Sequence, residues 1–150
     1  MRSKYLSLNI LIFSMFVTGC VSYPVVGAFE NTDEIFRGTV DHNLLIGAGD
    51  INVEAERSGI QCKGTSRVTY VPPFSLSCAG QRGEAPMRCD DGRFLTVVWT
   101  ADSCTSGTGN GKDDQEGKFN FVFGLSEQEA MEFINQRAQL NKSKSGATKN

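Results

Sequence analysis

The feature that most constrains the fold is a glycine-centred unit that recurs through the middle of the chain. Residues 89–99 (CDDGRFLTVVW) and 114–124 (DQEGKFNFVFG) each place an acidic residue before a glycine, a basic residue after it, and then a β-rich run. Residues 61–71 (QCKGTSRVTYV) form a looser copy. The spacing between equivalent glycines is 28 and then 25 residues, for Gly64, Gly92 and Gly117. A period of this length indicates a repeated supersecondary unit.

Each unit is predicted to be a β-hairpin. Glycine after an acidic residue suits a tight turn, because glycine adopts positive φ without steric cost. The runs that follow are rich in Val, Thr, Phe and Tyr, which is the composition of strands. Residues 38–40 (GTV) and 50–55 (DINVEA) add a further strand pair near the start. The predicted fold is mainly β: a disulfide-stapled antiparallel meander of hairpins over residues 36–125, followed by one C-terminal helix.

Glycine-rich steps precede the β-rich runs, at GAGD from Gly47, GQRG from Gly80 and SGTGNG from Ser106. We interpret them as turns between units. Residues 107–111 (GTGNG) lack the Lys-Ser/Thr pair of a phosphate loop and do not open a helix, so anion binding is not expected there. Pro72 and Pro73 make residues 72–77 an edge strand or a loop.

The chain changes character after Gly124. Ser126, with Glu129 three positions later, forms a capping box. Ala130, Ile134 and Ala138 recur with helical spacing. Residues 126–140 are therefore predicted to form an amphipathic helix that covers one side or end of the sheet. Residues 141–150 (NKSKSGATKN) are predicted to be a disordered tail.

The beginning of the chain is typical of an export signal. Arg2 and Lys4 give it a basic start. The apolar run over residues 5–17 is too short for the ~20 residues that a spanning helix needs. It ends in VTGC at residues 17–20, which resembles the lipobox of bacterial lipoproteins.

This resemblance implies that residues 1–19 are a signal peptide and that Cys20 is the lipid attachment site. The Cys20 sulfur would carry a diacylglycerol, and the new amino group would be acylated, for example with palmitate. Two or more acyl chains anchor a protein stably to a bilayer. Residues 20–35 would be a lipidated tether. Val21 after the cysteine, rather than an aspartate, favours the outer membrane, on either its periplasmic or its surface side.

Four further cysteines remain, Cys62, Cys78, Cys89 and Cys104. An even number in an exported chain indicates two disulfides. Cys62 and Cys89 occupy the same place in consecutive units, as do Cys78 and Cys104, so the pairs 62–89 and 78–104 are favoured. The sequential pairs 62–78 and 89–104 are the close rival. A zinc site is not expected, because no CxxC pair occurs and the only histidine, His42, is distant in sequence.

The charge argues against a nucleic-acid partner. The chain has 15 Lys and Arg and 17 Asp and Glu, and the signal peptide removes Arg2 and Lys4 but no acid, so the mature chain carries a net charge of −4. No concentrated basic face is available to release counterions from nucleic acid or from anionic headgroups. No motif for a metal or another cofactor is present, and none is expected.

No catalytic constellation is identified. A Ser-His-Asp arrangement would use His42 with Asp41, but adjacent residues of a strand face opposite ways. His42 is therefore interpreted as a surface turn residue. The carboxylate pairs Asp90-Asp91 and Asp113-Asp114 precede turn glycines, which explains them as turn residues.

Trp99 and Tyr70 fall at matched places in the repeat and are interpreted as core residues rather than as an aromatic binding strip. The body of the chain, residues 38–124, also carries C-x-DGR, G-T-G-x-G and G-K-F-x-F-x-F-G. This combination resembles small exported bacterial proteins of unknown role and is faintly similar to membrane occupation and recognition nexus repeats. The regular YxGxxxxGxxxG spacing of those repeats is missing here, so the resemblance implies hairpin geometry and no binding residues.

The expected function is that of a non-catalytic bacterial envelope lipoprotein with a structural or binding role. Its partners would be the membrane, through the lipid on Cys20, and an envelope protein. Two alternatives stay open. One is a small exported inhibitor or surface-interaction factor on a disulfide-stapled scaffold. The other is an exported hydrolase-like enzyme that uses His42.

Overall fold

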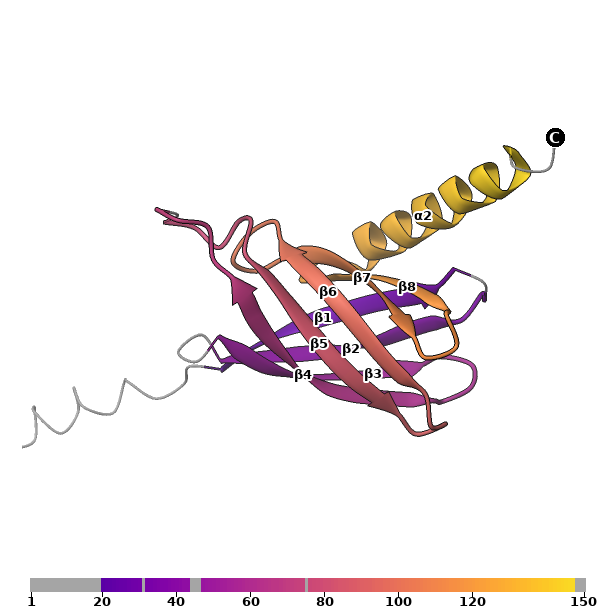
Figure 1. Ribbon diagram of the computed structural model, residues 1–150, viewed down its shortest axis with the longest axis horizontal. Helices are drawn as coiled ribbons and strands as arrows, with labels where there is room; N and C mark the ends of the chain where they lie inside the picture. Colours follow the sequence, from indigo (N-terminus) through magenta and orange to yellow (C-terminus); the bar gives the residue numbers. More distant parts are fainter. Residues whose placement is uncertain (1–19, 31, 44–46, 75, 148–150) are drawn as a thin grey trace, which may run out of the picture.

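Eight strands follow one another around a closed antiparallel barrel (Figure 1). The computed structural model describes residues 20–30, 32–43, 47–74 and 76–147, so the predicted signal peptide, residues 1–19, lies outside the described residues. The strands are β1 Cys20–Phe29, β2 Ile35–Asn43, β3 Ala48–Ala55, β4 Gln61–Tyr70, β5 Arg82–Cys89, β6 Phe94–Ala101, β7 Gly107–Asp113 and β8 Lys118–Phe123. The mainly β meander is confirmed. In addition, β1 pairs with both β2 and β8, which closes the sheet and removes its edges.

Side chains alternate between the barrel interior and its outer surface. In β6 the buried set is Leu95, Val97, Trp99 and Ala101, and the residues between them are exposed. In β3 the buried set is Gly49, Ile51, Val53 and Ala55. This strict period of two is the sequence pattern that made DINVEA and FLTVVW recognisable as strands.

The segment expected to be a tether is instead part of the barrel. β1 begins at Cys20, so the folded domain starts there and not at residue 36. Val25 and Phe29 of β1 belong to the barrel core, whereas Val26 belongs to a second cluster under the C-terminal helix. A strand covered on both faces carries apolar residues at successive positions. The alternation that marks a half-exposed strand is therefore missing from VSYPVVGAF.

The turns of the two most similar repeat units lie where the sequence predicts them. Gly92 lies between β5 and β6 with φ 93°. Between β7 and β8 the residue with positive φ is Glu116, at 64°, rather than the glycine that follows it. Asp113 stabilises this turn, because its Oδ1 accepts the backbone N–H groups of Gln115 and Gly117 at 3.1 and 2.7 Å.

Two glycine segments that were expected to be turns are strands. Gly64 of the looser repeat lies inside β4, where an added Cβ would stand 2.1 Å from the carbonyl oxygen of Pro86. The GTGNG run forms most of β7. At Gly109 an added Cβ would lie 2.3 Å from the ring of Phe121. These glycines are required by the close approach of a neighbour, not by turn geometry.

The helix α2, Glu127–Ala147, begins with the predicted capping box. The backbone N–H and the hydroxyl of Ser126 both donate to Glu129 Oε2, at 3.0 and 2.6 Å. The helix runs to residue 147, so the expectation of a disordered tail from residue 141 is wrong over 141–147. A capped and nucleated helix adds residues at little cost, even without an apolar face.

The first half of α2 packs on the barrel. Ala130 and Ile134 are buried against Val26 of β1 and Val122 of β8, and the later turns project beyond the barrel (Figure 1). The apolar stripe that predicted the helix thus covers one side of the sheet, as expected. Within the described residues, no helix combines the length and the apolar character needed to cross a bilayer.

Candidate functional site

The barrel interior is filled at one end and hollow at the other. The hollow end is where β1 begins, and it also carries the β2–β3, β4–β5 and β6–β7 connections. A cavity of about 330 Å³ opens there. The interior of an eight-stranded barrel is just wide enough to be filled by side chains or to hold one small ligand. This end has the second arrangement.

The cavity wall is mainly apolar. Its buried apolar side chains are Val25, Val40, Ile51, Trp99, Ala101 and Phe121. Partly buried side chains continue the wall toward the mouth, namely Tyr23, Val68 and Phe123. A large apolar surface with few hydrogen-bonding groups is typical of sites for small organic ligands.

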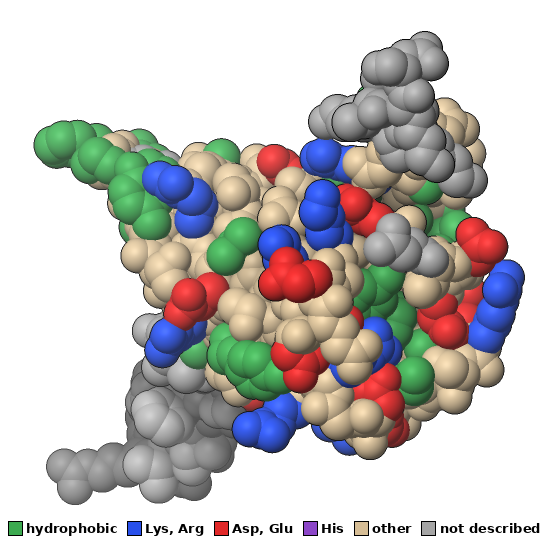
Figure 2. Space-filling model, turned by 45° about the vertical axis from the view of Figure 1, so that its right-hand side comes forward, with side chains coloured by type: hydrophobic (Ala, Val, Ile, Leu, Met, Phe, Trp, Pro, Cys, Tyr) green, Lys and Arg blue, Asp and Glu red, His purple; other side chains and the backbone are tan. Residues whose placement is uncertain are grey.

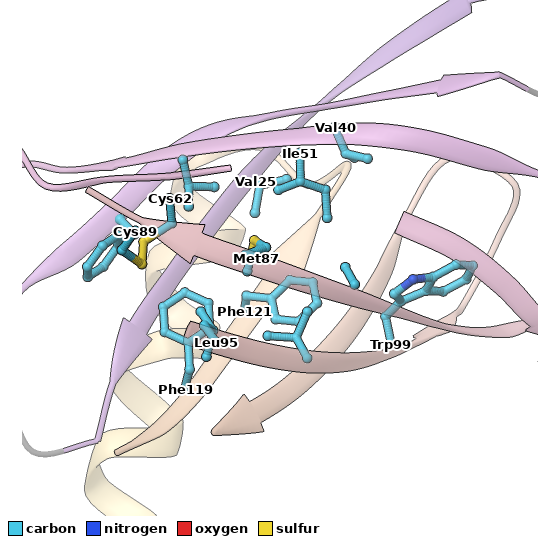
Figure 3. Packing of buried hydrophobic residues seen from close by; sticks show 14 of the residues in the cluster. Val25, Val40, Ile51, Cys62, Met87, Cys89, Leu95, Trp99, Phe119 and Phe121 are labelled. Carbon is cyan, nitrogen blue, oxygen red and sulfur yellow. A yellow bond between two sulfur atoms is a disulfide. The ribbon is translucent and has the colours of Figure 1, made fainter. Parts of the chain in front are cut away.

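Trp99 is the single tryptophan of the chain and is fixed within this wall. Its indole N–H donates to Ser66 Oγ at 2.9 Å, which gives both buried polar groups a partner. Its ring meets the ring of Phe123 edge to face, with centroids 6.0 Å apart. Figure 3 shows Trp99 set apart from the side chains around Met87 and Leu95 that fill the other half.

Glycines explain why large aromatic residues surround a cavity instead of filling it. An added Cβ would lie 2.2 Å from the Trp99 ring at Gly83, and 2.5 Å from the Phe123 ring at Gly107. Phe121 covers Gly109 in the same way. Each ring therefore lies against the wall of the barrel, in space that a neighbouring side chain would otherwise occupy. The centre of this half stays open.

Polar groups gather at the mouth of the cavity. His42, Gln81 and Ser103 line it there, and the Tyr23 hydroxyl donates to the Cys104 carbonyl oxygen at 3.3 Å. Partial burial lowers the pKa of His42, which favours the neutral imidazole with one donor and one acceptor nitrogen. The cavity thus has an apolar interior and a hydrogen-bonding rim.

The two disulfides lie at opposite ends of the barrel. Cys62–Cys89 joins β4 to β5 inside the filled half, and Cys62 is completely buried. Cys78–Cys104 ties the β4–β5 connection to the β6–β7 connection, and both of its cysteines line the cavity. This is the pairing that the alignment of the repeats favours over the sequential one.

The filled end is sealed by aromatic rings and one ionic cluster. The rings of Phe29, Phe36 and Phe119 pack together with centroids 4.9–5.7 Å apart. The Arg93 guanidinium lies 4.9 Å from the Phe29 ring centroid and pairs with Asp91 at 2.7 Å and with Asp113 at 3.4 Å. Both carboxylates therefore act within turns, as the sequence predicts, and both help to close this end.

The residues weighed for catalysis do not converge. His42 lines the cavity mouth from β2 and is half-buried, so its interpretation as a surface turn residue is wrong, whereas Asp41 faces the outer surface. Trp99 is a core residue as predicted, whereas Tyr70 is exposed and carries the Arg82 guanidinium over its ring, so the interpretation of Tyr70 as a core residue is wrong. Among the described residues, no group of three or more His, Cys, Asp or Glu side chains could hold a metal ion.

Cys20, the predicted lipid attachment site, is the first residue of β1 and pairs in register with Asn43 at the end of β2. It therefore stands at the cavity end of the barrel. The cavity itself was missed from sequence. The signal that could have revealed it is the presence of glycines in β5 and β7 together with large aromatic residues in the neighbouring strands β6 and β8.

Comparisons with known proteins bear on the fold alone. No protein-family model matches the chain, and no curated protein sequence matches it. Among solved structures, the chain is similar to a designed protein, described as the de novo design of a fluorescence-activating beta barrel. The two share 14% identity and a TM-score of 0.50 over 70% of this chain and 91% of that one. The class defined by fold and site is thus a small closed β-barrel with an open apolar end.

Proposed function

We propose that this protein is a non-catalytic, lipid-anchored binding module of the bacterial envelope that holds a small amphiphile in the open end of its barrel. The observation that carries the proposal is the cavity, whose apolar wall is preformed around Trp99 and whose mouth carries hydrogen-bonding groups. Its volume of about 330 Å³ stands near the lower end of the ~300–1,000 Å³ range of small-molecule pockets.

The arrangement of polar and apolar groups favours one class of ligand. Val25, Val40 and Ile51 would surround an apolar tail, and burial of that tail would drive binding. His42, Gln81 and Ser103 are placed to hydrogen-bond a polar head at the mouth. A single-chain amphiphile, such as a fatty acid, fits both parts of the cavity.

The anchor supports the same proposal. A lipobox at residues 17–20 would leave Cys20 as a lipidated amino terminus, at the end of the barrel where the cavity opens. Two or more acyl chains on Cys20 would hold the protein stably at a membrane, with the outer membrane as the favoured location. The enzyme alternative has less support, because among the described residues no carboxylate lines the cavity beside His42.

The test uses the intrinsic fluorescence of Trp99. The mature chain with Cys20→Ser, titrated with dodecanoate below its micelle concentration, is expected to show a saturable change in Trp99 emission. Val40→Phe places a ring inside the cavity and should abolish that change. An unsaturable signal, or one that Val40→Phe leaves intact, would contradict binding in the cavity.

The anchor is tested separately by intact-mass analysis. The full-length chain expressed in a bacterial host should yield a mature protein that begins at Cys20 and carries the mass of its acyl chains. Cys20→Ser should prevent both processing and acylation. A mature protein with a bare thiol at Cys20 would contradict the anchor and leave the cavity result standing.

A further inference from the structure

The β4–β5 connection presents a tip of large apolar side chains to solvent. The relative exposure of Phe74 is 103% and that of Leu76 is 106%, and Val71 is also exposed. They account for much of the hydrophobic projection at the upper left of Figure 2. Contiguous exposed apolar side chains on a small domain mark sites of interaction with proteins or membranes.

The tip is held on a constrained base. Pro72 and Pro73 restrict the backbone on one side, and the Cys78–Cys104 disulfide ties the other side to the β6–β7 connection. The Gly80 N–H also donates to the Ala101 carbonyl oxygen at 2.8 Å. A constrained loop loses little conformational entropy when it binds. The exposed residues are therefore held on a constrained base and do not belong to a flexible linker.

The base of the loop has an amphipathic pair. Tyr70, at the end of β4, is exposed, and the Arg82 guanidinium lies 4.4 Å from its ring centroid. Tyrosine and arginine combine an apolar body with a polar end, which suits the headgroup level of a bilayer. The order along the projection is thus Tyr70 and Arg82 at the base, with Phe74 and Leu76 at the tip.

The position of the loop points to a membrane. The loop and Cys20 lie at the same end of the barrel, on the left of Figure 1, and the cavity opens between the strands that carry them. A lipid on Cys20 would bring this end, and no other, against the bilayer. The mature net charge of −4 disfavours attraction to anionic headgroups, so contact would have to be apolar.

We propose that Phe74 and Leu76 insert into the acyl region of the bilayer and, together with the lipid on Cys20, turn the cavity mouth toward the membrane. The ligand would then exchange between the bilayer and the cavity without crossing water. The inference deepens the proposed function and rests on its lipid anchor and its amphiphile-binding cavity.

The first test places a fluorescent side chain at the tip. In a Trp99→Phe background, the acylated full-chain product carrying Phe74→Trp is reconstituted in phosphatidylcholine vesicles with brominated acyl chains. Severalfold quenching of the indole is expected. Phe94→Trp in the same background is the matched control, since Phe94 is exposed but lies at the filled end, and its indole should stay unquenched. Equal quenching at both positions, or none at position 74, would overturn the inference.

The second test keeps Trp99 and needs no acyl chain. The mature chain with Cys20→Ser should bind neutral and anionic vesicles alike, with weak dependence on salt. Phe74→Ser with Leu76→Ser should weaken binding by on the order of tenfold or more, as expected for removing two large apolar side chains from hydrocarbon. Val98→Ser, an exposed valine on the outer wall, should bind as the parent does.

The outcomes separate the two proposals. If the variant with Phe74→Ser and Leu76→Ser binds both dodecanoate and vesicles as the parent does, the membrane inference fails and the cavity function stands. If vesicles quench the indole at position 74 but dodecanoate does not bind, the cavity function fails. If the protein binds through Phe74 and Leu76 only to vesicles that also contain envelope proteins, the tip contacts a protein partner and the inference is overturned.

Discussion

The two ends of this barrel are built from the same strands but fill their interiors differently. At the filled end, three phenylalanine rings, a buried disulfide and Leu95 leave no open centre, and Arg93 closes the outside. At the hollow end, Trp99 and Phe123 lie flat against glycines, and a cavity remains. Side-chain placement, and not strand number, therefore decides whether a small barrel is solid.

The difference also suggests that one end provides stability and the other provides binding. The filled end has a closely packed interior, and tightly packed apolar contacts dominate the stability of a small domain. The hollow end carries the candidate site, the loop with the apolar tip and the predicted lipid. Substitutions at the filled end should consequently lower the free energy of unfolding, whereas substitutions at the hollow end should mainly change ligand binding.

The largest effect is expected from Phe119→Ala at the filled end. Phe119 is almost fully buried among Phe29, Phe36 and Phe121, so its loss should lower the free energy of unfolding by about 3–5 kcal/mol. Phe123→Ala, on the same strand at the hollow end, should cost clearly less. Urea unfolding measures both. Similar losses of unfolding free energy at the two positions would show that the two ends contribute equally to stability, against this expectation.

Removal of each disulfide gives a second comparison. The bonds close loops of similar length, with sequence separations of 27 and 26, so the loss of chain constraint should cost about 3.5 kcal/mol in each case. Cys62→Ala with Cys89→Ala additionally leaves a gap in the filled end and should cost more than Cys78→Ala with Cys104→Ala. Unfolding midpoints that shift equally would show that the burial of Cys62–Cys89 adds nothing.

A matched pair of valines tests where space exists. Val97→Phe at a tightly packed position should lower the free energy of unfolding by about 1–3 kcal/mol, because the extra ring has no room. Val40→Phe should leave stability nearly unchanged, because the ring enters the cavity. Thermal unfolding followed by circular dichroism compares them. A large loss with Val40→Phe would mean that the hollow end is not open.

The smallest effect is a pH dependence at the mouth. Burial lowers the pKa of His42 in the folded state below its usual value of 6.5. In the window just below that value the unfolded chain binds more protons, so stability falls as the pH falls through about 6.5 and levels off below the folded-state pKa. His42→Gln should remove this part of the pH dependence. Unfolding midpoints compared at about pH 7.5 and about pH 5.5 would refute it if both proteins changed equally.

Local features of the fold could be predicted from sequence. Alternation identified β3 and β6, the acid-glycine pairs located the turns at Gly92 and beside Gly117, and Ser126 with Glu129 marked the start of α2. In each case the deciding interaction lies within a few residues of the signal. The observed cysteine pairing is the one that the repeat favours, although the paired residues are 27 and 26 positions apart, because equivalent positions of neighbouring hairpins come close together.

Other features could not be predicted because a distant partner decides them. The glycines of β7 resemble a turn in sequence, and only the rings of β8 that cover them make a strand the better structure. β1 lacks alternation because α2 covers its outer face. The sequence predicts His42 in a turn, whereas it lies in β2 and lines a cavity mouth that residues from several distant parts of the chain complete.

The sequence by itself determined the alternating strands β3 and β6, the turns at Gly92 and beside Gly117, and the helix cap, since local steric preferences and short-range hydrogen bonds control these. Only the tertiary structure decided that β1 meets β8 to close a barrel, and that one end remains hollow. The space left inside is the sum of inward side chains from all eight strands, and no local stretch of the chain contains that sum.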